Sequence, residues 1–387
     1  MPKDLTDIDE WKVIAVPVGT DPAVASSVET PFQSITNRTR YLKNILFGMR
    51  ALNYKQASLT AGAIAALASD QIRGLCFDAS LNAFTALTKD GYTIYSYHLG
   101  DGGATPAMGG HGYAWDDEGT QNPNGIGGSW VNNNTAIVSN QNGQRIVINF
   151  NIADTIAISS ALNTWTTQAT SGSGNFWYDI DHDKSGLYVI VGLSGVIQSS
   201  PDGTTWTART SGVGENFVSV RHSYDSNNSY WVALTTNYAA HSADGITWSN
   251  NTHSLPSTPA NKCLAYSKVE GWWGAVLQNG DMAWSDDNGA TWNYDPDPFG
   301  LGPGPITGLD KMHLECDGNG TWIFDYSDLT ASTPGRRWVS VDDGFNWYEV
   351  FDGMDSGGDL MRVCFGNGLF AAVGRSEIYT SLRQIGA

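Results

Sequence analysis

A short phrase recurs through most of the chain at nearly constant spacing. Each clear copy holds a serine, an aspartate, a glycine and a tryptophan, and successive tryptophans lie 42, 44 and 55 residues apart. A degraded copy ending at Trp165 precedes them. The clear copies contain Ser200, Asp202, Gly203 and Trp206; Ser242, Asp244, Gly245 and Trp248; Ser285, Asp287, Gly289 and Trp292; and Ser340, Asp342, Gly344 and Trp347. Repeats of about 40–50 residues are typical of solenoids and propellers.

The phrase itself predicts the turn of a β-hairpin. Serine and aspartate side chains accept hydrogen bonds from turn amides, and glycine adopts the positive φ that a tight turn needs. The tryptophan then begins the next strand and buries its ring against a neighbouring element. Because every clear copy carries the aspartate, and one protein has no use for an active site in each repeat, we interpret these residues as structural.

The stretches between the phrases also repeat. A turn leads into an aromatic residue and an apolar run, as in residues 186–192 and 368–374, and a further short apolar segment lies upstream, as in residues 217–220. Such runs bounded by turn residues predict buried strands. Each unit is therefore four short strands, and closing the units into a ring protects their edges. The sequence predicts an all-β fold, a six- or seven-bladed β-propeller with four-stranded blades, of which seven is preferred.

The predicted propeller occupies residues 72–387 and follows a different segment, residues 1–71. The whole formal charge of -18 lies after residue 70, because residues 1–70 hold seven basic and seven acidic side chains. The last unit ends after Ser381 without a copy of the phrase. We therefore expect residues shortly before Gly74 to supply its outermost strand and so to close the ring.

Charge and hydropathy restrict the partners. An acidic surface repels phosphate, so we expect no nucleic-acid binding. The longest run of small apolar residues, 61–68, is too short to span a bilayer, so no membrane insertion is expected. The first residues are acidic and lack the basic and apolar regions of a signal peptide.

Residues 1–71 are predicted to be mostly helical. Ile35, Leu42 and Met49 lie seven apart within residues 32–49, and an alanine-rich stretch follows over residues 57–70. The seven-residue spacing suits a short coiled coil or a helix that docks on a partner. The alternative is a helix that packs on the propeller.

The repeated phrase resembles the Asp-box repeat of sialidases and related propellers, which residues 285–292 match at full length. The resemblance implies a propeller whose boxes lie at the blade periphery, away from the ligand face. Enzymatic sialidases also carry an Arg-Ile-Pro motif, an arginine triad and a Tyr/Glu pair. This chain has no Arg-Ile-Pro, which argues against a sialidase. Another glycosidase would need two carboxylates, one with a raised pKa, and the sequence selects no such pair.

Residues 37–44, which follow an extended segment over residues 21–32, resemble the start of many bacteriophage tail and fibre proteins. The resemblance implies a virion protein of the tail-fibre or receptor-binding type, a homotrimer made in the host cytoplasm without a signal peptide. Residues 1–71 would attach it to other virion proteins, and the propeller would bind a bacterial surface glycan or receptor without catalysis. The alternatives are a glycan-cleaving tail enzyme and a structural decoration or baseplate protein.

Four tryptophans have no obvious place in the repeat: Trp115, Trp130, Trp177 and Trp272. Sugar rings stack on aromatic faces, so these four are the candidate ligand-binding residues. Binding tends to sit on long loops of a rigid scaffold, and the alternative is that the irregular segments of the chain are merely variable connections.

The remaining candidates for chemistry favour structural interpretations. Asp179, Asp181 and Asp183 have calcium-loop spacing, but Lys184 and Ile190 stand where that loop needs glycine and glutamate, so a solvated turn is preferred to Ca²⁺. No cofactor or metal is therefore predicted. Two histidines at matching repeat positions are expected to pack rather than to catalyse, and the cysteines to point into a packed layer: His182, His222, Cys76, Cys263, Cys316 and Cys364.

Overall fold

The computed structural model describes residues 54–56, 58–59, 72–88, 93–98, 113–117, 135–140, 142–149, 152–161, 164–301, 312–326, 336–350, 362–373 and 378–381. All of them belong to the second of two units of the chain, residues 44–387. Within these ranges the regular structure is β-strand, apart from one turn of 3₁₀-helix at Leu193–Gly195. The helix predicted over residues 32–49 lies outside the described residues. In this part of the chain no helix is long and apolar enough to cross a membrane.

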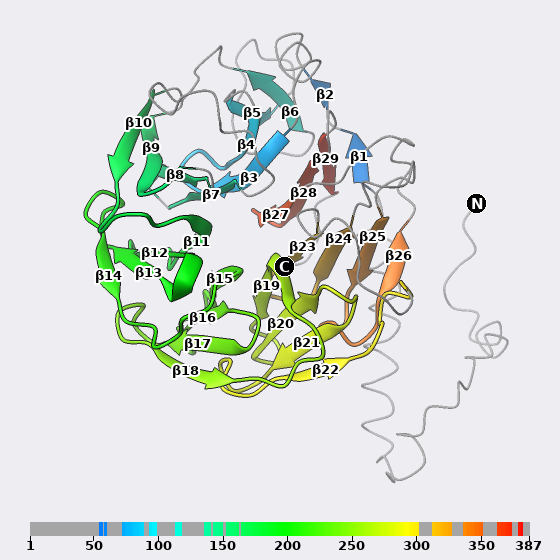
Figure 1. Ribbon diagram of the computed structural model, residues 1–387. Helices are drawn as coiled ribbons and strands as arrows, with labels where there is room; N and C mark the ends of the chain where they lie inside the picture. The colour runs from blue at the N-terminus through cyan, green and yellow to red at the C-terminus, as the bar shows by residue number, and fades with distance from the viewer. Residues whose placement is uncertain are drawn as a thin grey trace, which may run out of the picture. The chain divides into compact units, whose positions relative to one another are not determined.

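The strands form seven sheets arranged as the blades of a β-propeller (Figure 1), which confirms the preferred blade number. The first blade contains β3 (Ile72–Asp78), β4 (Ala83–Thr88), β5 (Thr93–His98) and β6 (Tyr113–Asp117). The second contains β7 (Ala136–Ser139), β8 (Arg145–Ile148), β9 (Thr155–Ala161) and β10 (Thr164–Ala169). The third contains β11 (Trp177–His182), β12 (Tyr188–Gly192), β13 (Ile197–Ser200) and β14 (Thr207–Arg209). The fourth blade contains β15 (Ser219–His222), β16 (Trp231–Leu234), β17 (Tyr238–Ser242) and β18 (Ser249–Thr252), and the fifth contains β19 (Pro259–Ser267), β20 (Trp272–Leu277), β21 (Met282–Ser285) and β22 (Asn293–Asp295). The sixth contains β23 (Met312–Cys316), β24 (Trp322–Tyr326), β25 (Arg336–Ser340) and β26 (Tyr348–Val350). The seventh contains β27 (Arg362–Gly366), β28 (Leu369–Val373) and β29 (Ile378–Ser381). Each blade is an antiparallel meander whose first strand lies innermost, and successive innermost strands contact one another around the ring.

Two short strands from before residue 72 close the ring. β1 (Tyr54–Gln56) pairs antiparallel with β29 and becomes the outermost strand of the seventh blade, as the sequence predicted. β2 (Ser58–Leu59) pairs in parallel with β6, at the outer edge of the first blade. Residues 54–59 thus supply one strand to the last blade and one to the first, and so link the two blades. The helix predicted over residues 57–70 is wrong at Ser58–Leu59, because the open edge of β6 offers these residues backbone partners; its other residues lie outside the described ranges.

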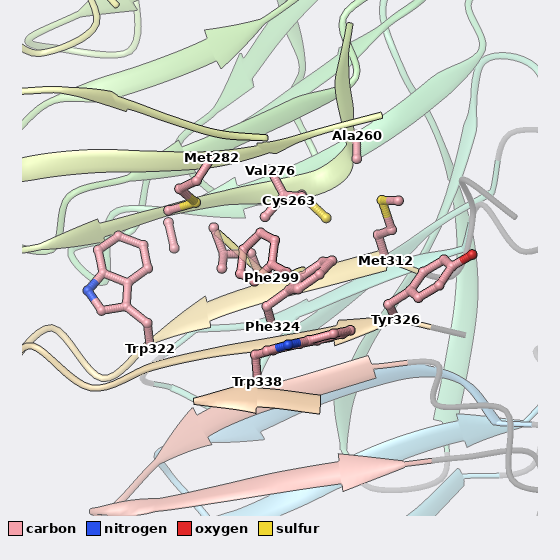
Figure 2. Close-up of a cluster of buried hydrophobic side chains, with 12 residues drawn as sticks. Ala260, Cys263, Val276, Met282, Phe299, Met312, Trp322, Phe324, Tyr326 and Trp338 are labelled. Carbon is pink, nitrogen blue, oxygen red and sulfur yellow. The ribbon is translucent and has the colours of Figure 1, made fainter. Parts of the chain in front are cut away.

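The apolar runs of the sequence form the second strand of each blade. In β12, β16, β24 and β28 every residue is buried. A strand in the middle of a blade is covered by the neighbouring blades on both faces, so it reads as a continuous apolar run rather than as an alternating one. Between the fifth and sixth blades the rings of Phe299, Phe324 and Trp338 pack together (Figure 2), with Phe299 and Phe324 centroids 4.4 Å apart.

The turn that leaves the innermost strand is capped in the same way in several blades. The last side chain of the strand accepts a hydrogen bond from the backbone N–H two residues later. The acceptors are Asp78 Oδ1, His182 Nδ1, His222 Nδ1, Ser267 Oγ and Cys316 Sγ, at 2.8–3.3 Å. His182 and His222 therefore occupy matching repeat positions, at which each ring caps a turn.

The four Ser–Asp–Gly–Trp phrases form hairpin turns between the third and fourth strands, which we call the box turns. In the turn at Ser242, the serine hydroxyl donates to Asp244 and accepts from the N–H of Gly245, whose φ is 67°. Trp248 Nε1 donates back to the Gly245 carbonyl at 3.2 Å. Hydrogen bonds from the backbone of Thr247 and Ile246 hold the pKa of Asp244 below its usual value. These contacts are local and hold the turn.

The fourth box turn departs from the others in one bond. Trp206, Trp248 and Trp292 each donate from Nε1 to the carbonyl of the box glycine. Trp347 Nε1 has no hydrogen-bond partner, and its ring instead packs edge-on against Phe299 with centroids 4.9 Å apart.

Candidate functional site

A cavity of about 420 Å³ lies at the centre of the ring. Residues of all seven innermost strands line it, from β3, β7, β11, β15, β19, β23 and β27. Lining residues in the first halves of the strands, such as Lys262 and His313, are buried, whereas Lys184, Tyr224 and Lys268, in the turns after the strands, are exposed. The pocket therefore opens toward these turns and has its floor near the starts of the innermost strands.

The box turns lie at the same end of the blades as this opening. In an antiparallel meander the first and third turns fall at one end and the second at the other. The box turns are third turns and the pocket mouth is built from first turns. The boxes are thus peripheral, as the resemblance implied, yet they do not lie at the end opposite the pocket.

An ion pair crosses the pocket wall between the third and fourth blades. Arg221 Nη1 lies 2.7 Å from Asp179 Oδ2, and the carboxylate also accepts bonds from Ser219 and the N–H of Val220. Asp179 is 1% exposed. A buried charge needs such compensation, so Asp179 fixes the position of the Arg221 guanidinium in the pocket.

Asp181 makes a second link between the same blades. One oxygen accepts the N–H of His222 at 2.8 Å, and the other accepts a short bond from the Tyr224 hydroxyl. Tyr224 is 39% exposed at the mouth of the pocket, and Lys184 Nζ lies 4.0 Å from the centre of its ring. The mouth thus presents an aromatic ring whose hydroxyl bonds the carboxylate beneath it, and a cation over the face of that ring.

The two turn-capping histidines are neutral components of this wall. His182 Nε2 bonds the Ser139 carbonyl while its Nδ1 accepts from Lys184, and His222 Nε2 lies 3.1 Å from the Ser229 hydroxyl. Burial lowers the pKa of both rings, more than Asp181 raises it. With both nitrogens of each ring engaged, we assign them a positioning role.

Glu315 is a carboxyl group that faces the pocket from β23. It alternates with Leu314, whose side chain packs in the apolar core between the blades. The pKa of Glu315 is raised to about 7, because burial raises it more than the charge of Arg221 lowers it and the charge of Asp181 adds to the rise. A carboxyl with this pKa exchanges its proton near neutral pH, which is the property required of a general acid or base.

His313 faces the floor of the same pocket, two residues before Glu315 on one face of β23. It is 6% exposed. Burial lowers its pKa well below the usual value, and the cations Arg362, Arg221 and Lys262 lower it further. The ring is therefore neutral at pH 7 amid positive charge.

The cysteines lie on four innermost strands, β3, β19, β23 and β27, and all four are free thiols. Three line the pocket: Cys76, Cys316 and Cys364. Burial raises the pKa of every thiol, to about 12 for Cys76 and Cys263. Protonated, buried thiols act as small apolar groups rather than as nucleophiles.

The four candidate tryptophans are not brought together. Trp177 has no exposed surface and packs in the core of the second and third blades. Trp272 is partly buried beside Trp284 and Phe345. Trp115 belongs to β6, where its backbone pairs with β2, and Trp130 lies outside the described residues. None of the tryptophans that the structure describes lines the pocket.

The three aspartates with calcium-loop spacing do not converge on one point. Asp179 and Asp181 bond the neighbouring blade, whereas Asp183 accepts the N–H groups of Ser185, Gly186 and Leu187 in its own turn. Among the described residues no group of three His, Cys, Asp or Glu side chains is placed to hold a metal ion. The alternation of strand residues explains the spacing.

Comparison with known proteins identifies the fold. Neither a family model nor a curated protein matches the sequence. Among solved structures, YCF48 bound to D1 peptide has a TM-score of 0.55 at 11% identity over 86% of this chain and 95% of that one. YCF48 from Cyanidioschyzon merolae has a TM-score of 0.56 at 12% identity, over 86% and 98%. A catalytically inactive virginiamycin B lyase from Staphylococcus aureus with quinupristin has a TM-score of 0.57 at 10% identity, over 86% and 99%. At these identities the likeness shows that the chain has the β-propeller fold.

Proposed function

We propose that this chain is a bacteriophage virion protein of the tail-fibre or receptor-binding type, whose propeller binds a bacterial surface glycan or protein receptor without catalysis. The observation that carries the proposal is the central pocket. It is deep, lined by charged side chains that ion pairs and turn caps hold in place, and open at one end of the ring. Such preorganised polar groups in a concave site are what ligand recognition requires.

The first residues of the chain support the virion assignment. Residues 21–44 resemble the start of phage tail and fibre proteins, which precedes the receptor-binding part. We propose that residues 1–71, apart from β1 and β2, which belong to the propeller, contact other virion proteins and that the protein is a homotrimer. Protein receptors fall within the proposal because one structural neighbour is a propeller bound to a peptide.

The trimer is tested by light scattering on two chains. The full chain is expected at three times its mass of 41.7 kDa. A chain that begins at Asn44 keeps every described strand but lacks the resembling segment, and is expected to be monomeric. A monomeric full chain would contradict the trimer. A trimeric Asn44 chain would show that the residues responsible for assembly lie after residue 43.

Ligand binding is tested on an array of purified bacterial capsules, O-antigens and teichoic acids, with the full chain as probe. We expect saturable binding to a small subset, and we expect Tyr224→Ala to weaken it about tenfold, because exposed aromatic residues at the centre of a site carry much of its energy. Tyr294→Ala is the matched control, since Tyr294 is similarly exposed but lies on an outermost strand. Equal losses in both variants would place the site elsewhere, and no binding to any array member or host envelope protein would favour a structural virion role.

A second function, glycan cleavage, is favoured by one observation. Glu315 has a pKa of about 7 inside the pocket and so can donate a proton at neutral pH. New reducing ends released from a bound polysaccharide, and their loss in Glu315→Gln, would establish the enzyme. Binding without release would leave the non-catalytic assignment in place.

A further inference from the structure

The floor of the pocket contains a polar atom without a partner. His313 Nδ1 is buried and makes no hydrogen bond, although the residue lines the pocket and is only 6% exposed. A buried polar nitrogen left unpaired costs free energy unless a ligand or water satisfies it. The unpaired nitrogen therefore marks a contact point for an occupant of the pocket.

Positive charge gathers around this nitrogen from three other innermost strands, β15, β19 and β27. Lys262 Nζ and Arg362 Nη2 both donate to the carbonyl oxygen of Thr135, at 2.9 and 3.3 Å, so the two cations lie next to each other. Together with Arg221 they lower the pKa of His313. Lys262 and Arg362 are at most 5% exposed. In so desolvated a place an anion interacts with these cations more strongly than it would in water.

We propose that the floor of the pocket binds an oxyanion carried by the ligand, a carboxylate or a phosphate group, with His313 Nδ1 as a donor and Arg221, Lys262 and Arg362 as the surrounding positive field. The inference rests on the proposed binding function and names the chemistry that this function would recognise. It places the charged end of the ligand at the floor and its neutral part toward Tyr224 and the mouth.

Glu315 adds a pH dependence to this site. It projects from the same strand face as His313 and lies near Arg221, Asp181 and Lys184. Its pKa of about 7 makes it neutral in mildly acidic solution and negative in mildly basic solution. A negative Glu315 repels an incoming anion and a protonated Glu315 does not, while His313 stays neutral throughout, so anion affinity should rise as the pH falls from 8 to 6.

The test is calorimetric titration of the full chain with sodium sulfate at constant ionic strength, because the charge of sulfate does not change between pH 6 and pH 8. We expect saturable binding that is about fivefold tighter at pH 6. His313→Leu should weaken it about tenfold, as expected for loss of a hydrogen bond to a charged group. His253→Leu is the matched control, because His253 also has a buried, unpaired Nδ1 but does not line the pocket.

A second variant keeps the test decisive if His313→Leu folds poorly. Glu315→Gln should bind sulfate at pH 8 as tightly as the parent does at pH 6, a gain that misfolding cannot produce. Acetate and methyl phosphate, titrated in parallel at pH 6, distinguish a carboxylate site from a phosphate site by which one binds more tightly. No saturable binding, or equal affinity in the His313 variant and its control, would overturn the inference.

Failure of this inference and failure of the proposed function remain distinguishable. Saturable sulfate binding without binding to any array member or host envelope protein would overturn the receptor-binding function and leave the anion site. If Tyr224→Ala weakens binding to the array and His313→Leu leaves it unchanged, the receptor-binding function stands and the anion site is overturned.

Discussion

Arg337→Ala is expected to lower the free energy of unfolding by about 3–5 kcal/mol. Arg337 has no exposed surface, and its Nε and Nη2 lie 2.6 and 2.7 Å from the two carboxylate oxygens of Asp325 on the adjacent strand. Removing the guanidinium leaves a carboxylate buried between blades without its counter-charge. The cost comes from this uncompensated charge rather than from the lost attraction alone.

Urea unfolding followed by tryptophan fluorescence measures the change. Arg336→Ala is the control: Arg336 is the neighbouring residue, but its bond to Glu349 is at the surface, with side chains 37% and 27% exposed. It should cost less than about 1 kcal/mol. The double variant Asp325→Leu/Arg337→Leu should recover much of the loss, because it leaves no buried charge. The account would be contradicted if the free energy of unfolding of Arg337→Ala were equal to or higher than that of Asp325→Leu/Arg337→Leu.

A chain that begins at Ile72 is expected to be less stable than one that begins at Asn44 by about 3–5 kcal/mol. The shorter chain lacks β1 and β2, so the outer edges of β29 and β6 lose their partners. Each ladder hydrogen bond contributes about 1 kcal/mol net, and the exposed edges promote aggregation.

Thermal unfolding and light scattering on both chains measure this difference. A synthetic peptide of residues 50–61 added to the Ile72 chain should restore part of the stability, because it supplies the missing strands in trans. Equal stability of the two chains would show that the ring closes without these residues.

The repeat predicted the fold because each copy encodes one supersecondary unit. The box glycines, the tryptophans and the apolar second strands are local signals, so four-stranded blades, a ring of six or seven of them with seven preferred, and a closing strand from before Gly74 could be predicted from spacing. The helix expected at Ser58–Leu59 was wrong because its partner is an open edge far away in the sequence. Composition alone cannot reveal such an edge.

The site was much less predictable. Its charged residues stand at alternate positions of the innermost strands, where Asp179, Asp181 and the pair His313 and Glu315 share the face that lines the pocket. The alternation of these charged residues is visible in the sequence, but which face of a strand lines the pocket depends on how the blades close into a ring. The candidate tryptophans were chosen for lacking a repeat position. Trp177 shows why that criterion is weak, since a core between blades also uses tryptophans outside the repeat.

The pocket as the site of ligand recognition is tested most directly by hydrogen exchange on the full chain, with and without the polysaccharide that binds most tightly on the array. The account predicts slower exchange in the turns at residues 183–187, 223–230 and 317–321, which surround the pocket mouth. It predicts no change in the outermost strands β14, β18 and β22. Slower exchange confined to those outermost strands, with the turns unchanged, would contradict it.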